Sequence, residues 1–547
     1  MKVLKSLFYL SILCFCLVSC SSKQQVDTLV FNATIYTVDS SFSSTEAMAI
    51  KDGKIVETGT NKDLQEKYQA KENIDAQGKF IYPGFIDAHA HFIGYAEALQ
   101  RAGLYGTKSW DEILEILKTF SATHQEGWIL GRGWDQNNWP IKSFPTNEKL
   151  NELFPNRPVM LMRVDGHAAI VNNKALELAN IKAGDKMIGG DVVVKNGKLT
   201  GLLIDNAVDL VSAKIPETTD EQFAKNLLQA QENCFAVGLT TIDDCGMHYK
   251  NVEKIKALQE AQQLKMRFYI MLSDEKDNYD YADKKGIIKT NQLNVRSFKV
   301  YGDGALGSRG ACLLQDYADQ HGHKGFLLSN PEHFDSVAQR LYSKGFQMCT
   351  HAIGDSGNRT ILDIYAKYLK GKNDLRWRIE HAQVVNENDF KKFAENSIIP
   401  SVQPTHATSD MYWAKDRLGE QREKGAYAYK TLLQQNGWLP LGTDFPVEDI
   451  STFKTFYAAT IRKDAKGWPE KGYQIENALT RKQTLQGMTI WAAKANFEEK
   501  EKGSLEKGKL ADFIILDKDL MNANENELLQ TNVLSTFING TKVYQKK

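Results

Sequence analysis

Short apolar runs, separated by longer stretches with the spacing of amphipathic helices, recur through the middle of the chain. Short apolar runs bounded by turn residues are typical of strands in a buried parallel sheet, and their alternation with helices indicates βα units. Eight parallel strands are the number that closes a TIM-like barrel. We therefore predict an α/β fold with a (β/α)8 barrel over residues 83–499, whose eight candidate strands lie at residues 80–86, 240–242, 267–271, 297–301, 347–350, 377–380, 398–402 and 438–442.

Both ends of the chain have a different pattern, with short alternating strands and tight turns. Residues 29–37 form one such strand, and residues 47–57 contain two more around the turn Asp52-Gly53, a sequence typical of hairpins. Residues 503–544 show the same pattern of short alternating strands and tight turns. We therefore predict that residues 28–82 and 500–547 form one composite β-sandwich.

The first and second candidate barrel strands are far apart in the sequence. Residues 101–238 between them are too many for a βα connection and contain elements of their own. We predict that they form a large insertion after barrel strand 1, placed over the mouth of the barrel.

The N-terminus contains Lys2 and Lys5, then an apolar run over residues 7–18 that ends in Leu17-Val18-Ser19-Cys20. The run is too short for a comfortable transmembrane helix and has the flanks of a signal peptide. Leu-Val-Ser-Cys resembles the bacterial lipobox. The resemblance implies a lipoprotein signal peptide over residues 1–19, a lipid anchor at Cys20, a polar tether over residues 20–27, and a cell-envelope location facing the periplasm or the cell surface. Plain secretion is the alternative.

Composition narrows the class of partner. The 547 residues include 68 Lys and Arg and 68 Asp and Glu, so the chain has no net charge that would attract nucleic acid. We expect it to contact a membrane only through the lipid anchor. We expect a small-molecule substrate, while the sequence leaves oligomerisation open. The cysteines after the leader form neither a disulfide framework nor a metal-ligand spacing: Cys234, Cys245, Cys312 and Cys349.

His89 and His91 lie one residue apart at the end of the first candidate barrel strand. Side chains alternate along a strand, so both imidazoles face the same way and can bind one divalent cation. Two histidines at this spacing can also coincide by chance. Further polar residues follow other strands: Lys299, His351, His381 and Asp444. Because barrel active sites lie at the carboxyl ends of the strands, we expect these side chains to converge there.

The run from Pro83 to His91, with His351, His381 and Asp444, resembles the amidohydrolase superfamily. Residues 131–135, 200–205 and 298–309 make the chain similar to its third amidohydrolase family, the branch of the N-substituted formamide deformylases. The match covers nearly everything after residue 27. It implies a barrel with a composite β-sandwich, and hydrolysis of a non-peptide carbon–nitrogen bond by metal-activated water. The bond would be an amide, a formamide or a cyclic amide.

The resemblance also implies roles for the strand-end residues. His89 and His91 would bind one metal ion, His351 and His381 a second, and Lys299 would bridge them after carboxylation. We expect one or two ions of a divalent metal, Zn²⁺ in the first place. Asp444 would bind the first ion and act as the general base. Without carboxylation, Lys299 could instead pair with Asp303, and a one-metal site would remain.

Five further residues are candidates for substrate binding, and each has a structural alternative. Arg309 could bind a carboxylate or form a structural ion pair. His406 and His167 could contact substrate or form structural hydrogen bonds. Trp134 and Asp135 could line the pocket or pack the insertion. Asp205 stands where the family pattern leads us to expect a glutamate, so we assign it no catalytic role.

Two other functions compete with the amidohydrolase. A non-catalytic lipoprotein could use the same barrel as a receptor for a small molecule or a metal. The same residues could also act on an ester or as an isomerase, because a fold does not determine its chemistry. A receptor has no need of both metal ligands and a carboxylate base, so we favour the enzyme.

Overall fold

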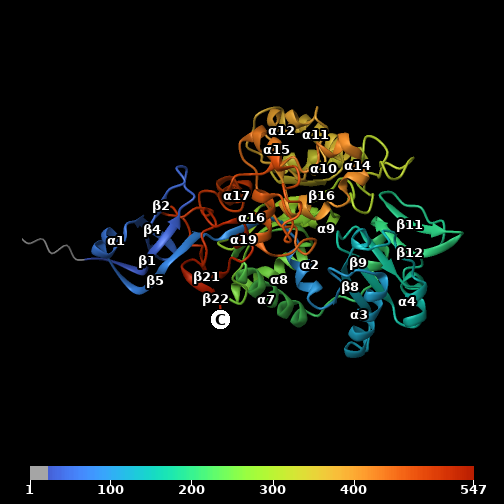
Figure 1. Ribbon diagram of the computed structural model, residues 1–547, viewed down its shortest axis with the longest axis horizontal. Coiled ribbons are helices and arrows are strands. Elements are labelled where there is room, and N and C mark those ends of the chain that lie inside the picture. The colour runs from blue at the N-terminus through green and yellow to red at the C-terminus, as the bar shows by residue number, and fades with distance from the viewer. Residues whose placement is uncertain (1–22) are drawn as a thin grey trace, which may run out of the picture.

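A computed structural model describes residues 23–547 of the protein. The predicted signal peptide and Cys20 lie outside the described residues, as does part of the predicted tether. The described chain forms three sheets, with the sheet of the two chain ends at one end, the barrel in the middle and the insertion at the other end (Figure 1). Among the described residues, no helix combines the length and apolarity that crossing a bilayer requires.

Both ends of the chain share the first sheet. Its strands follow the order β22-β21-β20-β5-β1-β3-β4, and β2 pairs with β1. The long strand β5 pairs in parallel with β1 and antiparallel with β20, so it joins the N-terminal strands to the C-terminal ones. The bounds are β1 Gln24–Tyr36, β2 Ser44–Thr45, β3 Ala47–Lys51, β4 Lys54–Gly59, β5 Tyr68–Pro83, β20 Phe513–Leu516, β21 Val533–Ile538 and β22 Thr541–Gln545.

The barrel prediction is confirmed. Parallel strands follow the order β19-β18-β17-β16-β14-β13-β6, with the short β15 (Ile288–Lys289) paired to β16. The eighth candidate strand contributes only a parallel bridge from Leu441 to Val402, and the Leu441 carbonyl accepts the Ala88 amide of β6, which closes the ring. The bounds are β6 Phe85–Ala90, β13 Leu239–Met247, β14 Arg267–Ser273, β16 Leu293–Tyr301, β17 Gln347–Ala352, β18 Arg378–His381 and β19 Ile399–Ser401.

The first candidate strand, predicted over residues 80–86, is two strands. Its first half is the end of β5 in the first sheet, and its second half begins β6 of the barrel. Gly84 separates them at a point of close contact, since a Cβ there would lie 2.4 Å from the Thr240 side chain. An apolar run alone does not reveal where a chain leaves one sheet for another.

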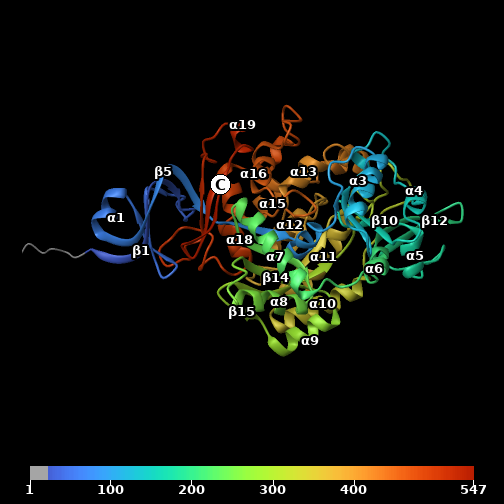
Figure 2. The ribbon, with the colours of Figure 1, turned by 90° about the horizontal axis from the view of Figure 1, so that it is seen from below.

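The insertion forms a six-stranded sheet with its own apolar core, in the order β11-β12-β10-β9-β8-β7. Helices α3 to α6 belong to this region, which lies at the end of the molecule opposite the first sheet (Figure 2). The bounds are β7 Ala102–Gly103, α3 Trp110–Thr123, β8 Ile129–Trp134, α4 Glu148–Leu153, β9 Val159–Arg163, β10 Ala168–Val171, α5 Asn173–Leu178, β11 Gly190–Lys195, β12 Lys198–Asp205 and α6 Asn206–Ser212.

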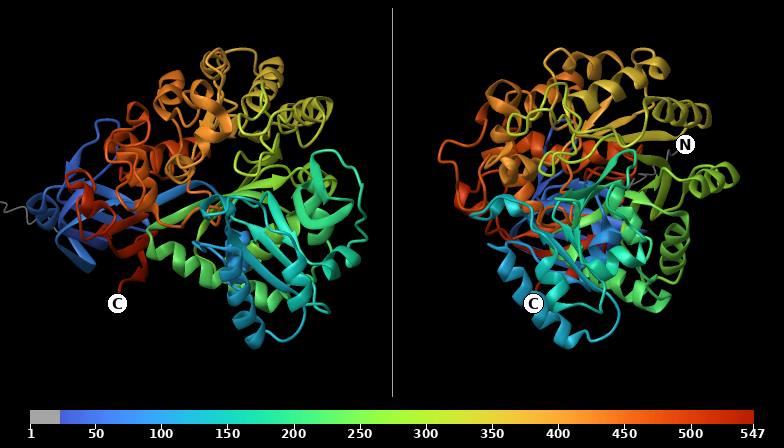
Figure 3. Two further views of the ribbon diagram at one scale, coloured as in Figure 1. Left: turned by 45° about the vertical axis from the view of Figure 1, so that its right-hand side comes forward. Right: turned by 90° about the vertical axis from the view of Figure 1, so that its right-hand side faces the viewer.

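The remaining helices surround the barrel strands (Figure 3). Helix α7, although it precedes β13, packs into the barrel core through Leu227 and Phe235. Helix α10 shows clear local signals, with Asn330 capping its start and Gly345 in a left-handed conformation at its end. Those covering the barrel include α2 Phe92–Ala98, α7 Asp220–Ala236, α8 Tyr249–Glu260, α9 Lys276–Lys285, α10 Pro331–Lys344, α11 Asp355–Leu369, α12 Phe390–Glu395, α13 Pro404–Asp410, α14 Ala414–Glu423, α15 Tyr429–Asn436, α16 Thr452–Ile461, α17 Arg481–Gly487 and α18 Ile490–Ala495.

Candidate active site

The polar residues that follow the barrel strands meet at one end of the barrel. His381 is the last residue of β18, and His89 and His351 are the penultimate residues of β6 and β17. Lys299 lies two residues before the end of β16, and Asp444 follows the eighth position. Most of them line a cavity of about 1160 Å³ between the barrel and the insertion, whose walls include His91, Lys299, His351, His381 and Asp444. His89 is fully buried behind them.

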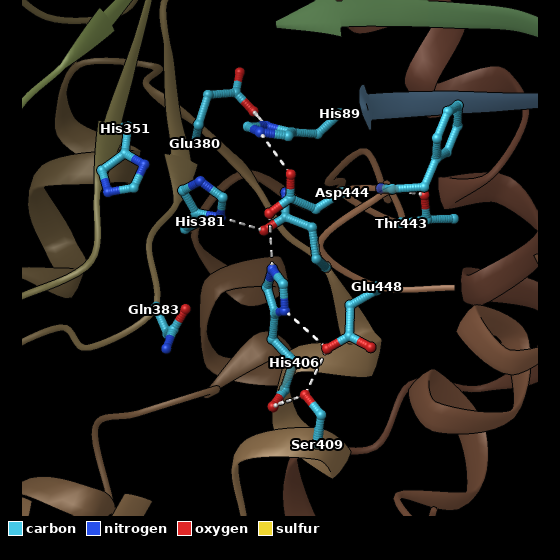
Figure 4. Close-up of polar contacts among 12 residues, drawn as sticks. His89, His351, Glu380, His381, Gln383, His406, Ser409, Thr443, Asp444 and Glu448 are labelled. Atoms are coloured by element: carbon cyan, nitrogen blue, oxygen red, sulfur yellow. Dashed lines mark hydrogen bonds and ion pairs between the residues drawn. The ribbon is translucent and has the colours of Figure 1, made fainter. Parts of the chain in front are cut away.

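Asp444 is the centre of the cluster (Figure 4). Its Oδ1 lies 3.2 Å from His91 Nε2 and 3.6 Å from His89 Nε2. Its Oδ2 lies 3.1 Å from His406 Nε2. Two groups of donors therefore share this carboxylate. One consists of His89, His91 and Asp444, the other of His381, His406 and Asp444, and within each group the ligand atoms lie within 4.8 Å of one another.

These residues fit a divalent metal. Asp444 Oδ1 is buried and has no hydrogen bond, although two imidazole nitrogens face it. Imidazole nitrogens and a carboxylate oxygen are the ligand types that Zn²⁺ prefers. His351 lies with its ring centroid 4.6 Å from that of His381, so it is beside the second group of donors.

Burial sets the charge of the histidines. It lowers the pKa of His89, His351 and His381 well below the usual range, with further lowering from nearby positive charge. Burial alone would raise the pKa of Asp444, but His89, His406 and His91 outweigh it and hold that pKa well below its ordinary value. Neutral imidazoles around an ionised carboxylate are the protonation states that metal binding requires.

Polar side chains behind the histidines orient their rings. Glu380 Oε2 lies 2.5 Å from His89 Nδ1, and both side chains are fully buried. With Nδ1 engaged, Nε2 is the nitrogen that faces Asp444. Gln403 Oε1 likewise lies 2.8 Å from His381 Nδ1. Carboxylate or carbonyl partners of this kind fix the tautomer and the orientation of a metal-binding histidine.

The loop that carries Asp444 is tied to the first barrel strand. Asp87 accepts hydrogen bonds from the Thr443 amide at 2.9 Å and the Thr443 hydroxyl at 2.7 Å. The Asp444 amide donates to the His89 carbonyl at 2.7 Å. A Cβ at Gly442 would lie 2.6 Å from the His89 amide nitrogen, so only glycine allows this approach.

Lys299 lies among the donors and is fully buried. Its Nζ is 3.2 Å from His89 Nε2. Asp303, the alternative partner considered from the sequence, instead accepts the backbone amides of Cys312, Ile353 and Gly354, at 2.8 to 2.9 Å. The lysine is therefore positioned at the predicted metal centre.

Three of the predicted substrate-binding residues line the cavity: His167, Asp135 and His406. His167 comes from the insertion, and its Nδ1 lies 2.5 Å from Asp205 Oδ1. Its ring centroid is 5.0 Å from that of His351, so the insertion reaches the barrel residues. Burial alone would lower the pKa of His406, but hydrogen bonds to Asp444 and Glu448 raise it well above the usual range.

Two predicted substrate-binding residues lie elsewhere. Arg309 is absent from the cavity wall and pairs with Asp319 at 2.9 Å, which is the structural alternative. Trp134 is fully buried in the core of the insertion, where its indole donates to the Leu161 carbonyl at 2.7 Å. Both side chains therefore have the structural alternative considered from the sequence, because proximity in sequence to a motif does not determine which side of a strand or loop faces the cavity.

Several residues of the site were missed from the sequence: Glu380, Gln403, Asp87 and Glu448. Glu380 and His381 are neighbours on β18, and strand alternation places such neighbours on opposite faces. Yet both contact His89, because His381 has a left-handed backbone with φ of 73° that breaks the alternation. The adjacency of an acid to a strand-end histidine was the signal available.

Comparisons with known proteins agree with this geometry. The sequence profile described as "Amidohydrolase family" matches residues 72–544. A putative amidohydrolase, YtcJ of Bacillus subtilis, is 31% identical over 94% of this chain and 98% of its own. N-substituted formamide deformylase of Arthrobacter pascens is 26% identical over 96% and 99%. A crystal structure of an uncharacterized metal-dependent hydrolase from Pyrococcus horikoshii superposes with a TM-score of 0.75 at 27% identity, covering 91% of this chain and 99% of that one.

Proposed function

The chain belongs to the amidohydrolase family, and from that premise we propose that it hydrolyses an amide, formamide or cyclic amide bond of a small molecule, with Asp444 as general base. As a member of this family, it is a metal-dependent hydrolase that acts on carbon–nitrogen bonds. The observation that carries the finer proposal is the position of Asp444, whose two carboxylate oxygens face His91 and His406 across the same cavity.

The metal ligands we propose are His89, His91 and Asp444 for one ion, with His351, His381 and Lys299 available for a second. A bound Zn²⁺ would supply a Lewis acid and lower the pKa of coordinated water toward roughly 7. Carboxylation would convert the Lys299 amine into an anionic oxygen ligand. The support for this assignment is burial of every one of these donors except the half-buried His91, together with the buried, unbonded Oδ1 of Asp444.

Asp444 would accept the proton of the attacking water and pass it to the leaving nitrogen. Its position suits that task because a short loop and the hydrogen bonds from Thr443 to Asp87 hold it against the first strand. His406 Nε2 donates to Oδ2, which orients the carboxylate and stabilises its charged form. His167, backed by Asp205, would orient the substrate from the opposite wall.

Purified protein tests this function. We expect elemental analysis to find stoichiometric Zn²⁺ or another divalent ion, and a panel of N-formyl, N-acyl and cyclic amides to include substrates whose hydrolysis stops with a chelator and resumes with metal. Hydrolysis that continues after complete metal removal would contradict the proposal. A matched panel of esters decides whether the same site prefers a carbon–oxygen bond.

We also propose that the protein is anchored in the cell envelope through Cys20, on the support of its leader sequence. The wild-type protein should fractionate with membranes and the Cys20→Ser variant should not. A variant that stays membrane-bound would exclude the anchor.

A further inference from the structure

The cavity contains a cation that the proposed metal site does not use. Three Lys or Arg side chains line its wall: Arg132, Arg163 and Lys299. Lys299 lies at the metal donors. Arg163 is ion-paired with Asp135 and Asp165. Arg132 differs from both.

Arg132 has no carboxylate partner among the described residues. Its guanidinium makes a long contact of 3.4 Å from Nη2 to the Val164 carbonyl, and its Nε is buried without a partner. It also lies close enough to the Tyr105 hydroxyl to oppose the rise that burial causes in the pKa of that group. A guanidinium has five donors, and each buried donor without a partner, as Nε is here, costs free energy. Most acids in the same wall already have partners, as with Asp205 and His167 or Glu448 and His406.

The backbone around Arg132 leaves little freedom. A Cβ at Gly131 would lie 2.9 Å from the side chains of Leu104 and Leu161. At Gly133 φ is 111° and a Cβ would lie 2.6 Å from the Tyr105 ring. The two glycines let the neighbouring side chains pack closely against the strand. The segment that carries Arg132 is therefore closely packed on both sides.

Two neighbours of Arg132, Gly166 and Tyr105, connect it to the segments of the proposed catalytic residues. A Cβ at Gly166 would lie 3.5 Å from Arg132 Nη2, and the ring of the next residue, His167, is tilted against that of His351 with centroids 5.0 Å apart. On the other side, the Tyr105 hydroxyl donates to the Pro446 carbonyl at 2.7 Å, two residues after Asp444. Arg132 therefore lies beside the segments that carry His167 and Asp444.

We infer that Arg132 binds a carboxylate of the substrate, so that the preferred substrates are amides that carry an acid group near the cleaved bond. The inference rests on the proposed function for the reaction but not for the binding. The planar guanidinium of Arg132, whose only carbonyl contact is the long one from Nη2 to Val164, matches a carboxylate in a bidentate arrangement. Arg132 then determines specificity, while bond cleavage belongs to the metal donors and Asp444.

Binding of matched ligand pairs tests the inference without turnover. The probes are the N-formyl, N-acetyl and N-benzoyl derivatives of glycine, each as free acid and as neutral glycinamide, titrated calorimetrically into the zinc-supplemented full-length protein. We expect at least one acid to bind roughly 10- to 100-fold more tightly than its amide, the range for a charge-assisted pair. The preference should shrink as salt concentration rises.

Three variants make the test specific. Arg132→Gln should bind acid and amide equally. Arg132→Lys should retain part of the preference for the acid, because lysine keeps the positive charge but cannot form the bidentate hydrogen bonds of a guanidinium. Arg340→Gln, which removes a surface arginine paired with Asp283 at 2.7 Å, is the control and should behave as wild type. Melting curves establish that each variant is folded. If Arg132→Gln does not fold, Arg132→Lys provides the comparison with wild type.

The inference is overturned if the wild type binds no acid more tightly than its amide, or if Arg132→Gln keeps the wild-type preference. Hydrolysis of the same compounds is measured in an assay separate from the binding titrations. If acids bind preferentially but no amide is cleaved, the proposed function fails and the inference stands. If amides are cleaved without any acid preference, the inference fails and the proposed function stands.

Discussion

At the scale of single residues, the site depends on how each donor is held. His89 is oriented by Glu380 at Nδ1 and faces Asp444 with Nε2. Glu380 Oε1 lies 3.9 Å from Nη1 of Arg378, which is fully buried and pairs with Asp243 at 3.0 Å. A buried carboxylate with a hydrogen bond to the imidazole on one oxygen and a cation near the other orients that imidazole.

Replacing Glu380 by Gln should weaken metal binding. Gln keeps an oxygen for His89 Nδ1 but removes the charge that makes the imidazole a better ligand, so we expect a loss of about 10- to 100-fold in affinity for Zn²⁺. Competition with a chromophoric chelator measures it. The surface substitution Glu115→Gln is the control, and equal affinities in both variants would contradict the role assigned to Glu380.

Replacing Asp444 by Asn should affect chemistry above all. The amide has the same shape but cannot accept the proton, and general-base catalysis contributes typically 10²- to 10⁴-fold. We expect kcat to fall within that range while the melting temperature stays close to wild type. His89→Ala should differ by losing metal as well, as elemental analysis will show. Wild-type turnover by Asp444→Asn would exclude this residue as the base.

At the scale of elements, glycines and short loops bring strands together at the site. The eighth position of the barrel is a loop rather than a regular strand, and it passes so close to β6 that it tolerates no side chain at Gly442. The position of Asp444 therefore depends on a contact between segments far apart in the sequence.

Gly442→Ala should disrupt the site. The new Cβ would lie 2.6 Å from the His89 amide nitrogen and 2.9 Å from Asp87 Oδ1, so the loop must move. Overpacking of this kind costs about 1–3 kcal/mol of stability. We expect a lower melting temperature together with weaker metal binding. Gly103→Ala, where a Cβ meets nothing within 4 Å, is the control and should change neither the melting temperature nor metal binding. If Gly442→Ala also changed neither, the loop would have adapted and the prediction would be wrong.

The insertion should contribute an acid-sensitive part of the stability. Burial alone would raise the pKa of Asp165, but Arg163 and His167 outweigh it and lower that pKa below its ordinary 3.8. A carboxyl whose pKa is lower in the folded state stabilises it above the unfolded pKa, and this contribution is lost as pH falls through the folded pKa. The drop in unfolding midpoint between pH 6 and pH 3 should be smaller in Asp165→Asn than in wild type. An equal drop would contradict this.

At the scale of the whole molecule, both chain ends and the insertion are coupled to one barrel. The sheet of the chain ends contacts the barrel through Thr536, whose hydroxyl donates to the Phe235 carbonyl of α7 at 2.7 Å. The insertion contacts it through Tyr105 and Pro446. The barrel between them therefore receives support at both of its ends.

Removing the last strands tests that coupling. Deleting residues 531–547 takes away β21 with buried Phe537 and Ile538, each worth about 1.5–3 kcal/mol. Against a typical total of 5–15 kcal/mol, we expect a large fall in melting temperature or loss of soluble protein. Deleting residues 540–547 removes only β22, which is mostly exposed, and should cost far less. Similar effects of both deletions would contradict this.

The sequence by itself determined the architecture and the family. Apolar runs alternating with helical stretches predicted the barrel, and the strand-end residues from His89 to Asp444 predicted where polar groups would meet, because strand direction alone places carboxyl ends at one rim. Only the tertiary structure decided which neighbours share the site. His381 joins Glu380 beside His89 because its own backbone is left-handed, Trp134 packs in a core, Arg309 pairs with Asp319, and Arg132 lines the cavity with no carboxylate partner among the described residues. These outcomes depend on contacts across distant segments, which local pattern does not encode.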